Sequence, residues 1–133
     1  MTKLDANIRP LVDALNAFEG ITTFGSCGGH KNPKPGQWPR GRWYVKFDVA
    51  QNAHGWRALE FLAWLFNEDM RRGSKQVWLY PYAPPPWLNT PGQVLCFTIE
   101  GWLDNPREVA DFLMRMMADY IPPEEDDEGG ERE

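Results

Sequence analysis

The chain has 133 residues, 42% of them hydrophobic, and a formal net charge of −5. A chain of this length folds as one domain around a single core. The two cysteines, Cys27 and Cys96, form no CxxC pair, which excludes a disulfide framework and a four-thiolate zinc site. Because the cysteines indicate no disulfide framework, we expect a cytoplasmic protein. No apolar run approaches the length of a membrane span, so we expect no membrane partner.

The charge is unevenly distributed along the chain. Residues 124–133 contain seven acids and one base, so residues 1–123 carry about +1. We expect residues 1–123 to form a single domain and the acidic tail, which cannot bury apolar surface, to be disordered. Residues 31–46 contain five cations and no acid, namely Lys31, Lys34, Arg40, Arg42 and Lys46.

The first third of the chain predicts a helix, a strand and a long loop. Apolar residues from Ile8 to Phe18 recur at helical spacing, with Asp5 or Asn7 as the predicted cap and Gly20 as the stop. Residues 21–26 are rich in β-branched side chains and predict a strand that ends at Cys27. The glycines and prolines of residues 28–41 predict an irregular loop.

The middle of the chain predicts a half-buried strand and an unusually apolar helix. Residues 42–50 alternate, with Trp43 on the inward face and Tyr44 on the outward face. Residues 52–70 follow a helical pattern whose aromatic side chains spread around more than one face. This helix is therefore either a core helix or, through Trp56 to Phe66, a homodimer interface.

The last third predicts two strands, over residues 76–82 and 94–100, joined by a proline-rich connection over residues 84–92. A final helix follows, capped by Asn105 with Pro106 at its first position. The order helix, strand, strand, helix, strand, strand, helix predicts an α+β two-layer sandwich. Its sheet is four-stranded and mainly antiparallel, with helices on one face.

Chemistry concentrates in residues 22–30, which combine a thiol, an imidazole, hydroxyls and glycines. Glycine-rich turns expose backbone amides that bind anions, and the neighbouring cations favour a phosphate or a carboxylate. The predicted binding residues are Thr23, Ser26, Gly28, Gly29, Arg40 and Arg42. The alternative is a turn whose glycines serve only the chain reversal.

The same turn contains the predicted catalytic residues, with Cys27 as a nucleophile and His30 as its base. The sequence identifies no third residue that would orient the imidazole, so a buried structural thiol is the alternative. Cys27, His30, His54 and Cys96 could supply zinc ligands, but only the first two have ligand-like spacing. The sequence therefore predicts no metal site.

Nucleic acid is the other predicted partner class. Trp38 and Tyr44 alternate with the cations of residues 31–46, which places stacking surfaces beside phosphate-binding groups. The partner would be RNA, DNA or a phosphate-bearing small molecule, bound by an enzyme or by a non-enzymatic module. A protein-interaction module is the remaining alternative.

The run from Thr23 to His30 resembles two groups of proteins. One is a set of small prokaryotic and phage proteins that share a Thr-x-x-Ser-Cys-x-Gly-His turn after a first helix. The other, more distantly, is the family of wybutosine-synthesising tRNA methyltransferases, whose hallmark is a Ser-Cys-Ser-Gly-Arg run. Ser26, Cys27 and Gly29 match that hallmark, whereas Gly28 and His30 replace its second serine and its arginine.

The second resemblance implies an α+β fold, S-adenosylmethionine as methyl donor and a modified guanosine in tRNA as substrate. The sequence as a whole predicts a small α+β protein with an anion- or nucleotide-binding turn, on a scaffold related to nucleic-acid modification. Whether the protein is an enzyme stays open at this point.

Overall fold

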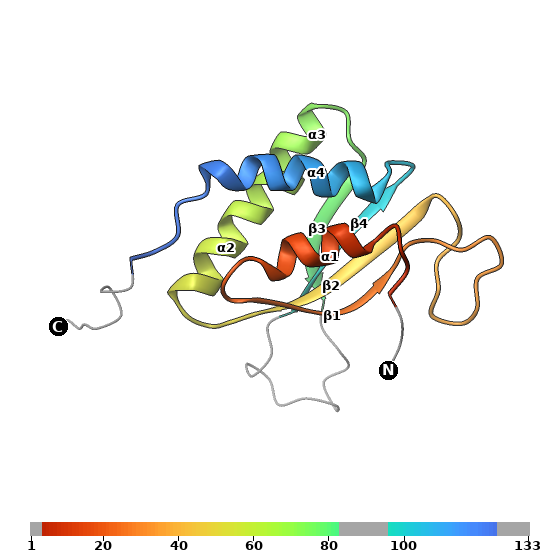
Figure 1. The fold of residues 1–133 in the computed structure, drawn as a ribbon, viewed down its shortest axis with the longest axis horizontal. Helices are drawn as coiled ribbons and strands as arrows, with labels where there is room; N and C mark the ends of the chain where they lie inside the picture. Colours follow the sequence, from red (N-terminus) through yellow and green to blue (C-terminus); the bar gives the residue numbers. More distant parts are fainter. Residues whose placement is uncertain (1–3, 83–95, 125–133) are drawn as a thin grey trace.

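The computed structural model describes residues 4–82 and 96–124. Its elements are α1 (Arg9–Asn16), β1 (Ile21–Cys27), β2 (Arg42–Val49), α2 (Ala53–Trp64), η1 (Leu65–Asp69), α3 (Met70–Arg72), β3 (Val77–Tyr82), β4 (Cys96–Trp102), α4 (Pro106–Met116) and η3 (Met117–Asp119) (Figure 1). The predicted proline-rich connection, residues 94–95 of the predicted fourth strand and all of the predicted acidic tail except Glu124 lie outside the described residues. No helix in the described ranges has the length and apolar character needed to cross a bilayer.

The strands form one antiparallel sheet in the order β1-β2-β4-β3. Helices α1, α2 and α4 lie together on one of its faces, so the predicted α+β two-layer fold is confirmed (Figure 1). The central pair β2 and β4 places Tyr44 opposite Glu100 and Lys46 opposite Thr98. We call the sheet face that lies opposite the helices the open face.

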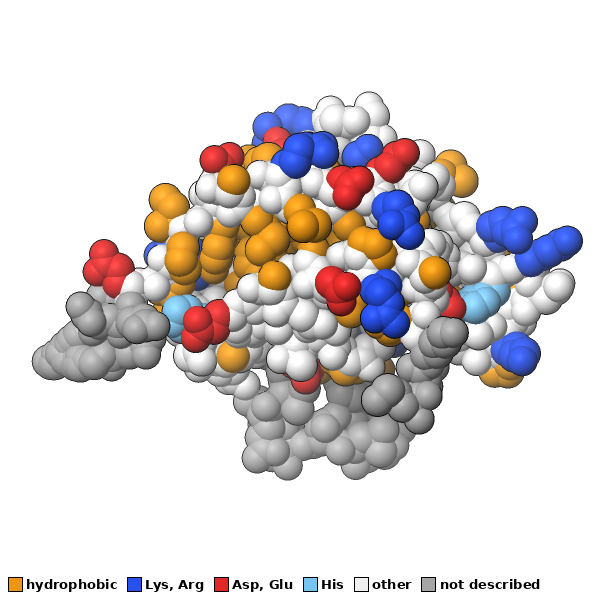
Figure 2. Space-filling model, in the orientation of Figure 1, with side chains coloured by type: hydrophobic (Ala, Val, Ile, Leu, Met, Phe, Trp, Pro, Cys, Tyr) orange, Lys and Arg blue, Asp and Glu red, His pale blue; other side chains and the backbone are white. Residues whose placement is uncertain are grey.

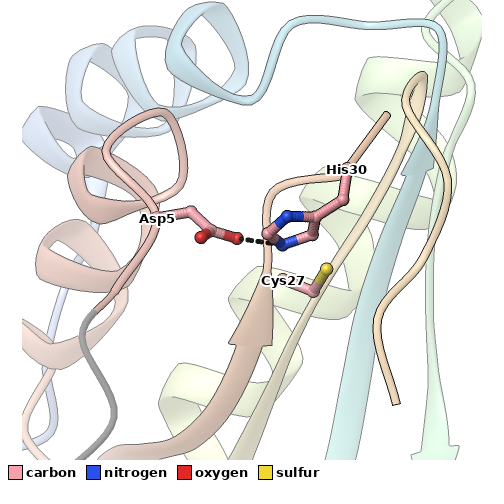
Figure 3. A group of neighbouring side chains, drawn as sticks. All are labelled: Asp5, Cys27 and His30. Carbon is pink, nitrogen blue, oxygen red and sulfur yellow. Dashed lines mark hydrogen bonds and ion pairs between the residues drawn. The ribbon is translucent and has the colours of Figure 1, made fainter. Parts of the chain in front are cut away.

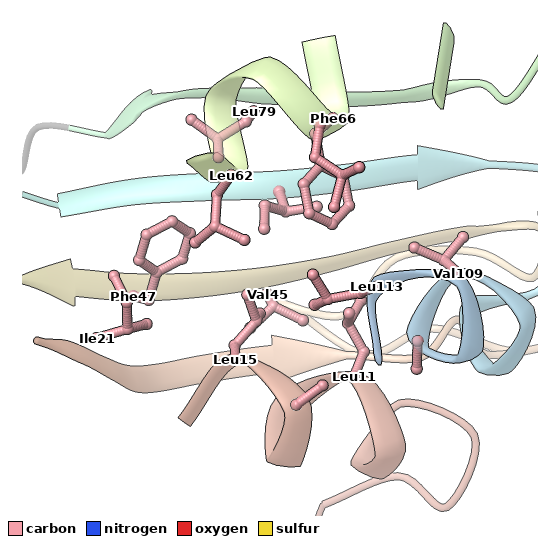
Figure 4. Close-up of a cluster of buried hydrophobic side chains, with 14 of the residues drawn as sticks. Leu11, Leu15, Ile21, Val45, Phe47, Leu62, Phe66, Leu79, Val109 and Leu113 are labelled. Atoms are coloured by element: carbon pink, nitrogen blue, oxygen red, sulfur yellow. The ribbon is translucent and has the colours of Figure 1, made fainter. Parts of the chain in front are cut away.

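The core lies between the sheet and the helices, and the alternation of β2 explains its centre. Trp43, Val45 and Phe47 are buried, as the sequence predicted for the inward face of this strand. Figure 4 shows the strand side chains meeting Leu11 and Leu15 of α1, Leu62 of α2, Phe66 of η1, and Val109 and Leu113 of α4. Each such burial stabilises the fold by roughly 1.5–3 kcal/mol.

The first helix begins differently from the prediction. It starts at Arg9, with Ile8 at the N-cap position and no side-chain cap, so the expectation that Asp5 or Asn7 would cap it is wrong. The backbone oxygen of Asp5 accepts from the N–H groups of Ile8 and Arg9 instead. The side chains of Asp5 and Asn7 are thereby free to bind the turn after β1.

The second predicted helix is confirmed and continues to Arg72 through the π-helical turn η1. The Asn67 side chain in η1 donates to the Leu79 carbonyl (3.0 Å) and accepts from the Leu79 N–H (2.8 Å). Asn16 at the end of α1 likewise accepts from the Thr23 N–H (2.9 Å), next to a bulge in β1. Two asparagines thus attach the helical layer to the outer strands β3 and β1.

Candidate functional site

Cys27 lies at the end of β1, as predicted, and only 3% of its surface is exposed. The loop that follows is organised by backbone hydrogen bonds, from the His30 N–H to the Trp38 carbonyl (2.8 Å) and from the Arg40 N–H to the His30 carbonyl (2.9 Å). Gly29 has a φ of +94°, and a Cβ there would lie 2.7 Å from the Arg42 carbonyl oxygen. This position therefore requires glycine.

The glycine-rich turn binds a carboxylate of its own chain. Oδ2 of Asp5 accepts from the Gly28 N–H (2.8 Å) and lies 3.1 Å from Nε2 of His30 (Figure 3). Asn7 adds a bond from its side-chain amide to the Gly28 carbonyl (2.9 Å). An external anion would have to displace Asp5 to reach the Gly28 N–H.

Asp5 is the residue beside the His30 imidazole that sequence reasoning did not identify. Ligand atoms of Asp5, Cys27 and His30 all lie within 4.8 Å of one another, with Asp5 in position to orient the imidazole. The Cys27 sulfur accepts from the Trp38 N–H (3.3 Å), and no hydrogen bond joins it to His30 within the described part of the chain. The only signal in the sequence was an acid just before a helix, which the predicted cap explained equally well.

The structure does not bring the other predicted site residues together at this turn. Thr23 pairs with Asn16 at the end of α1, and Ser26 is paired with Val45 in the sheet. Arg40 is exposed in the loop. The side chain of Arg42 lies among aromatic rings, as described below.

Two residues of the alternative zinc set, His54 and Cys96, lie elsewhere with partners of their own. Nε2 of His54 lies 3.6 Å from a carboxylate oxygen of Glu19. The Cys96 thiol donates to Oδ1 of Asp48 (2.9 Å), and burial together with this hydrogen bond raises the pKa of Cys96 to about 12. Neither residue joins Cys27 and His30.

Aromatic side chains cover the open face. The Trp38 ring packs against Tyr44 with the centroids 4.7 Å apart, and Trp78 contacts Trp102 at 5.7 Å. We name this surface the open-face platform, and its aromatic members are Phe24, Trp38, Tyr44, Trp78, Tyr80, Tyr82 and Trp102. The three most exposed of them are Phe24 (50%), Trp102 (39%) and Tyr80 (37%).

Two cations lie between these rings. The Arg42 guanidinium carbon is 5.1 Å from the Trp38 ring centroid and 4.3 Å from that of Trp102. The Lys46 ammonium is 5.3 Å from the Tyr44 ring and 4.1 Å from that of Tyr82. Nε of Arg42 is buried without a hydrogen-bond partner among the described residues.

Glu100 organises the centre of the platform. Its carboxylate accepts from the Tyr80 hydroxyl (2.8 Å) and from Nε1 of Trp102 (2.7 Å), and lies 3.8 Å from Nη2 of Arg42. Burial and the bond to Glu100 raise the pKa of Tyr80 to about 12, so this hydroxyl stays a neutral donor near pH 7.

The net positive charge lies beside the platform rather than on it. Glu100 and Asp48 offset Arg42 and Lys46 on the open face. The cations Lys31, Lys34 and Arg40, which form no ion pair with the described residues, are exposed in the β1–β2 loop. Figure 2 shows lysine and arginine side chains gathered at this end of the molecule.

Comparisons of the chain with protein-family models, with curated proteins and with solved structures find no match. The functional interpretation therefore depends on the geometry of the turn and the platform. Sequence reasoning found Trp38, Tyr44 and the cations. It missed Phe24 of β1 and four aromatic residues of the last two strands, Trp78, Tyr80, Tyr82 and Trp102. These four join the platform because β4 pairs with β2 and β3 pairs with β4.

Proposed function

We propose that the open-face platform binds single-stranded nucleic acid. The observation that carries this proposal is the position of Trp38, which belongs to the basic loop but packs its ring against Tyr44 of the sheet. Trp38 therefore connects the stacking surface of the sheet to the loop that contains the exposed cations Lys31, Lys34 and Arg40. Single strands are bound by this combination of aromatic rings and neighbouring positive charge.

The charge distribution supports a division of roles between the two surfaces. The platform is close to neutral, so it suits the bases, whereas Lys31, Lys34 and Arg40 suit the phosphates. Three phosphate contacts on a single strand correspond to a slope of about −2 in a plot of log affinity against log salt. A small slope of this kind distinguishes a stacking interface from a purely electrostatic one.

Fluorescence anisotropy of labelled single-stranded RNA and DNA, titrated with the full chain, tests the proposal. Because stacking contributes about 1–3 kcal/mol per base, Trp38→Ala should weaken binding by roughly 5- to 150-fold. Trp56→Ala removes an exposed tryptophan from the helical layer and is the matched control. Absence of saturable binding, or an equal loss in both variants, would contradict the proposal.

Anion or cofactor binding at the turn is a second candidate function, favoured by the bond from the Gly28 N–H to the Asp5 carboxylate. The resemblance adds S-adenosylmethionine as a candidate ligand. Asp5→Asn removes the competing negative charge, so we expect it to bind inorganic phosphate or S-adenosylmethionine several-fold more tightly than the wild type. Calorimetry that detects neither ligand with either protein would contradict this second function.

A further inference from the structure

Asp5, Cys27 and His30 present three different metal-ligating groups to one point. They come from the segment before α1, from the end of β1 and from the following loop, and their ligand atoms lie within 4.8 Å of one another (Figure 3). Zinc binds thiolate, imidazole and carboxylate at about 2.0–2.3 Å, so ligands of one tetrahedral ion lie about 3–4 Å apart. The separation of 3.1 Å between Oδ2 of Asp5 and Nε2 of His30 is in this range.

Backbone N–H groups hold two of these side chains in place. The Trp38 N–H donates to the Cys27 sulfur (3.3 Å), and the Gly28 N–H donates to Oδ2 of Asp5 (2.8 Å). Bonds of this kind orient metal ligands. The pair formed by Asp5 and His30 therefore keeps the donors assembled before an ion arrives.

Two of the three side chains are accessible to solvent. The side chains of His30 and Asp5 are 29% and 31% exposed, whereas Cys27 is buried. A protein site with three ligands and an open side leaves the fourth position of a tetrahedral ion to water. Coordination would replace the hydrogen bond between Asp5 and His30 and release the thiol proton of Cys27 to solvent.

We propose that Asp5, Cys27 and His30 bind one zinc ion, with water as the fourth ligand. The set differs from the zinc alternative of the sequence, because His54 and Cys96 pair with Glu19 and Asp48. Asp5 supplies the third protein ligand, which the sequence pattern did not reveal. The ion would join the N-terminal segment to the turn.

Cobalt(II), which substitutes for zinc and absorbs visible light, tests the site in the purified full chain. We expect one equivalent to bind, with the near-ultraviolet charge-transfer band of a cobalt–thiolate bond and strong tetrahedral d–d bands. Cys27→Ser should remove the charge-transfer band, and Asp5→Asn and His30→Gln should each weaken binding at least tenfold. The matched controls Cys96→Ser and His54→Gln should bind like the wild type.

Absence of saturable cobalt binding, or a thiolate band that survives Cys27→Ser, would overturn the proposal. X-ray absorption of the wild-type zinc complex provides a readout that does not depend on the folding of any variant. One sulfur at about 2.3 Å with nitrogen or oxygen at about 2.0 Å supports the proposed ligand set. A zinc shell without sulfur, or with two sulfurs, would overturn it.

Discussion

The Asp5 carboxylate lies 3.1 Å from Nε2 of His30, although the two residues are 25 positions apart in the chain. The same oxygen accepts from the Gly28 N–H, so one side chain fixes both ends of the glycine-rich turn. The segment before α1 is therefore part of the site and not only a lead into the helix. We therefore expect the stability of the fold to depend on Asp5.

Asp5→Ala should lower the free energy of unfolding by about 1–3 kcal/mol, because it leaves a partly buried N–H and an imidazole without their partner. Urea denaturation measures the change. Asp13→Ala replaces an exposed acid of α1 and should change stability by less than about 0.5 kcal/mol. Equal effects of the two substitutions would show that the turn does not depend on Asp5.

Gly101→Ala should disrupt the centre of the core. A Cβ at this position of β4 would overlap the indole of Trp43, which is fully surrounded and donates from Nε1 to the Asp104 carbonyl (2.8 Å). Overpacking of this kind costs about 1–3 kcal/mol or more. Gly25→Ala, where a Cβ has no atom within 4 Å, is the control in the same denaturation experiment. A Gly101 variant as stable as the control would contradict the packing described.

Stability should fall at alkaline pH through Cys96. The folded state raises the pKa of this thiol from 9.0 to about 12, so between these values the folded chain binds the proton more strongly than the unfolded chain. The contribution of the protonated thiol to the free energy of unfolding is intact below about pH 9. It is lost as the pH rises, at up to about 1.4 kcal/mol per pH unit. Cys96→Ser keeps a donor for Asp48 without this titration, so its stability should decline less between about pH 9 and pH 11. Equal declines in both proteins, measured by denaturation at each pH, would contradict this prediction.

The fourth test concerns the homodimer, which the sequence offered as the alternative to a core helix. Within its predicted surface Leu62 and Phe66 are buried in the core. Trp56 and Trp64 of α2 are 47% and 43% exposed, and Trp64 lines a shallow depression with Tyr120 and Ile121. Figure 2 shows hydrophobic side chains gathered across the helical layer. We expect self-association in sedimentation experiments that weakens several-fold in Trp64→Ser. Trp102→Ser, on the open face, should leave self-association unchanged. A wild-type protein that is monomeric in sedimentation would contradict the prediction of a homodimer.

Much of the fold could be predicted because its signals are local. The alternation of β2 predicted that Trp43 lies inside and Tyr44 outside, and Asn105 does cap α4. The site could be predicted only in part. Asp5 has the same local sequence as a helix cap, and only its contact with a turn 23 residues away reveals its role.

The open-face platform could likewise be predicted only in part from the sequence. Trp102 lies beside Arg42 because β4 pairs with β2, and strand order leaves no trace in the spacing of residues within one strand. Periodicity predicts which way a side chain faces. It does not predict which strand will be its neighbour.

The two asparagines that join helices to outer strands have a consequence for how the sheet meets other chains. The lateral edge of a sheet presents unpaired backbone groups that invite a foreign strand. Asn67 already satisfies both groups of Leu79, and Asn16 satisfies the Thr23 N–H beside a bulge that interrupts regular pairing. A strand adding at either edge would have to displace a side-chain amide. Lateral growth of the sheet is thereby opposed on both sides.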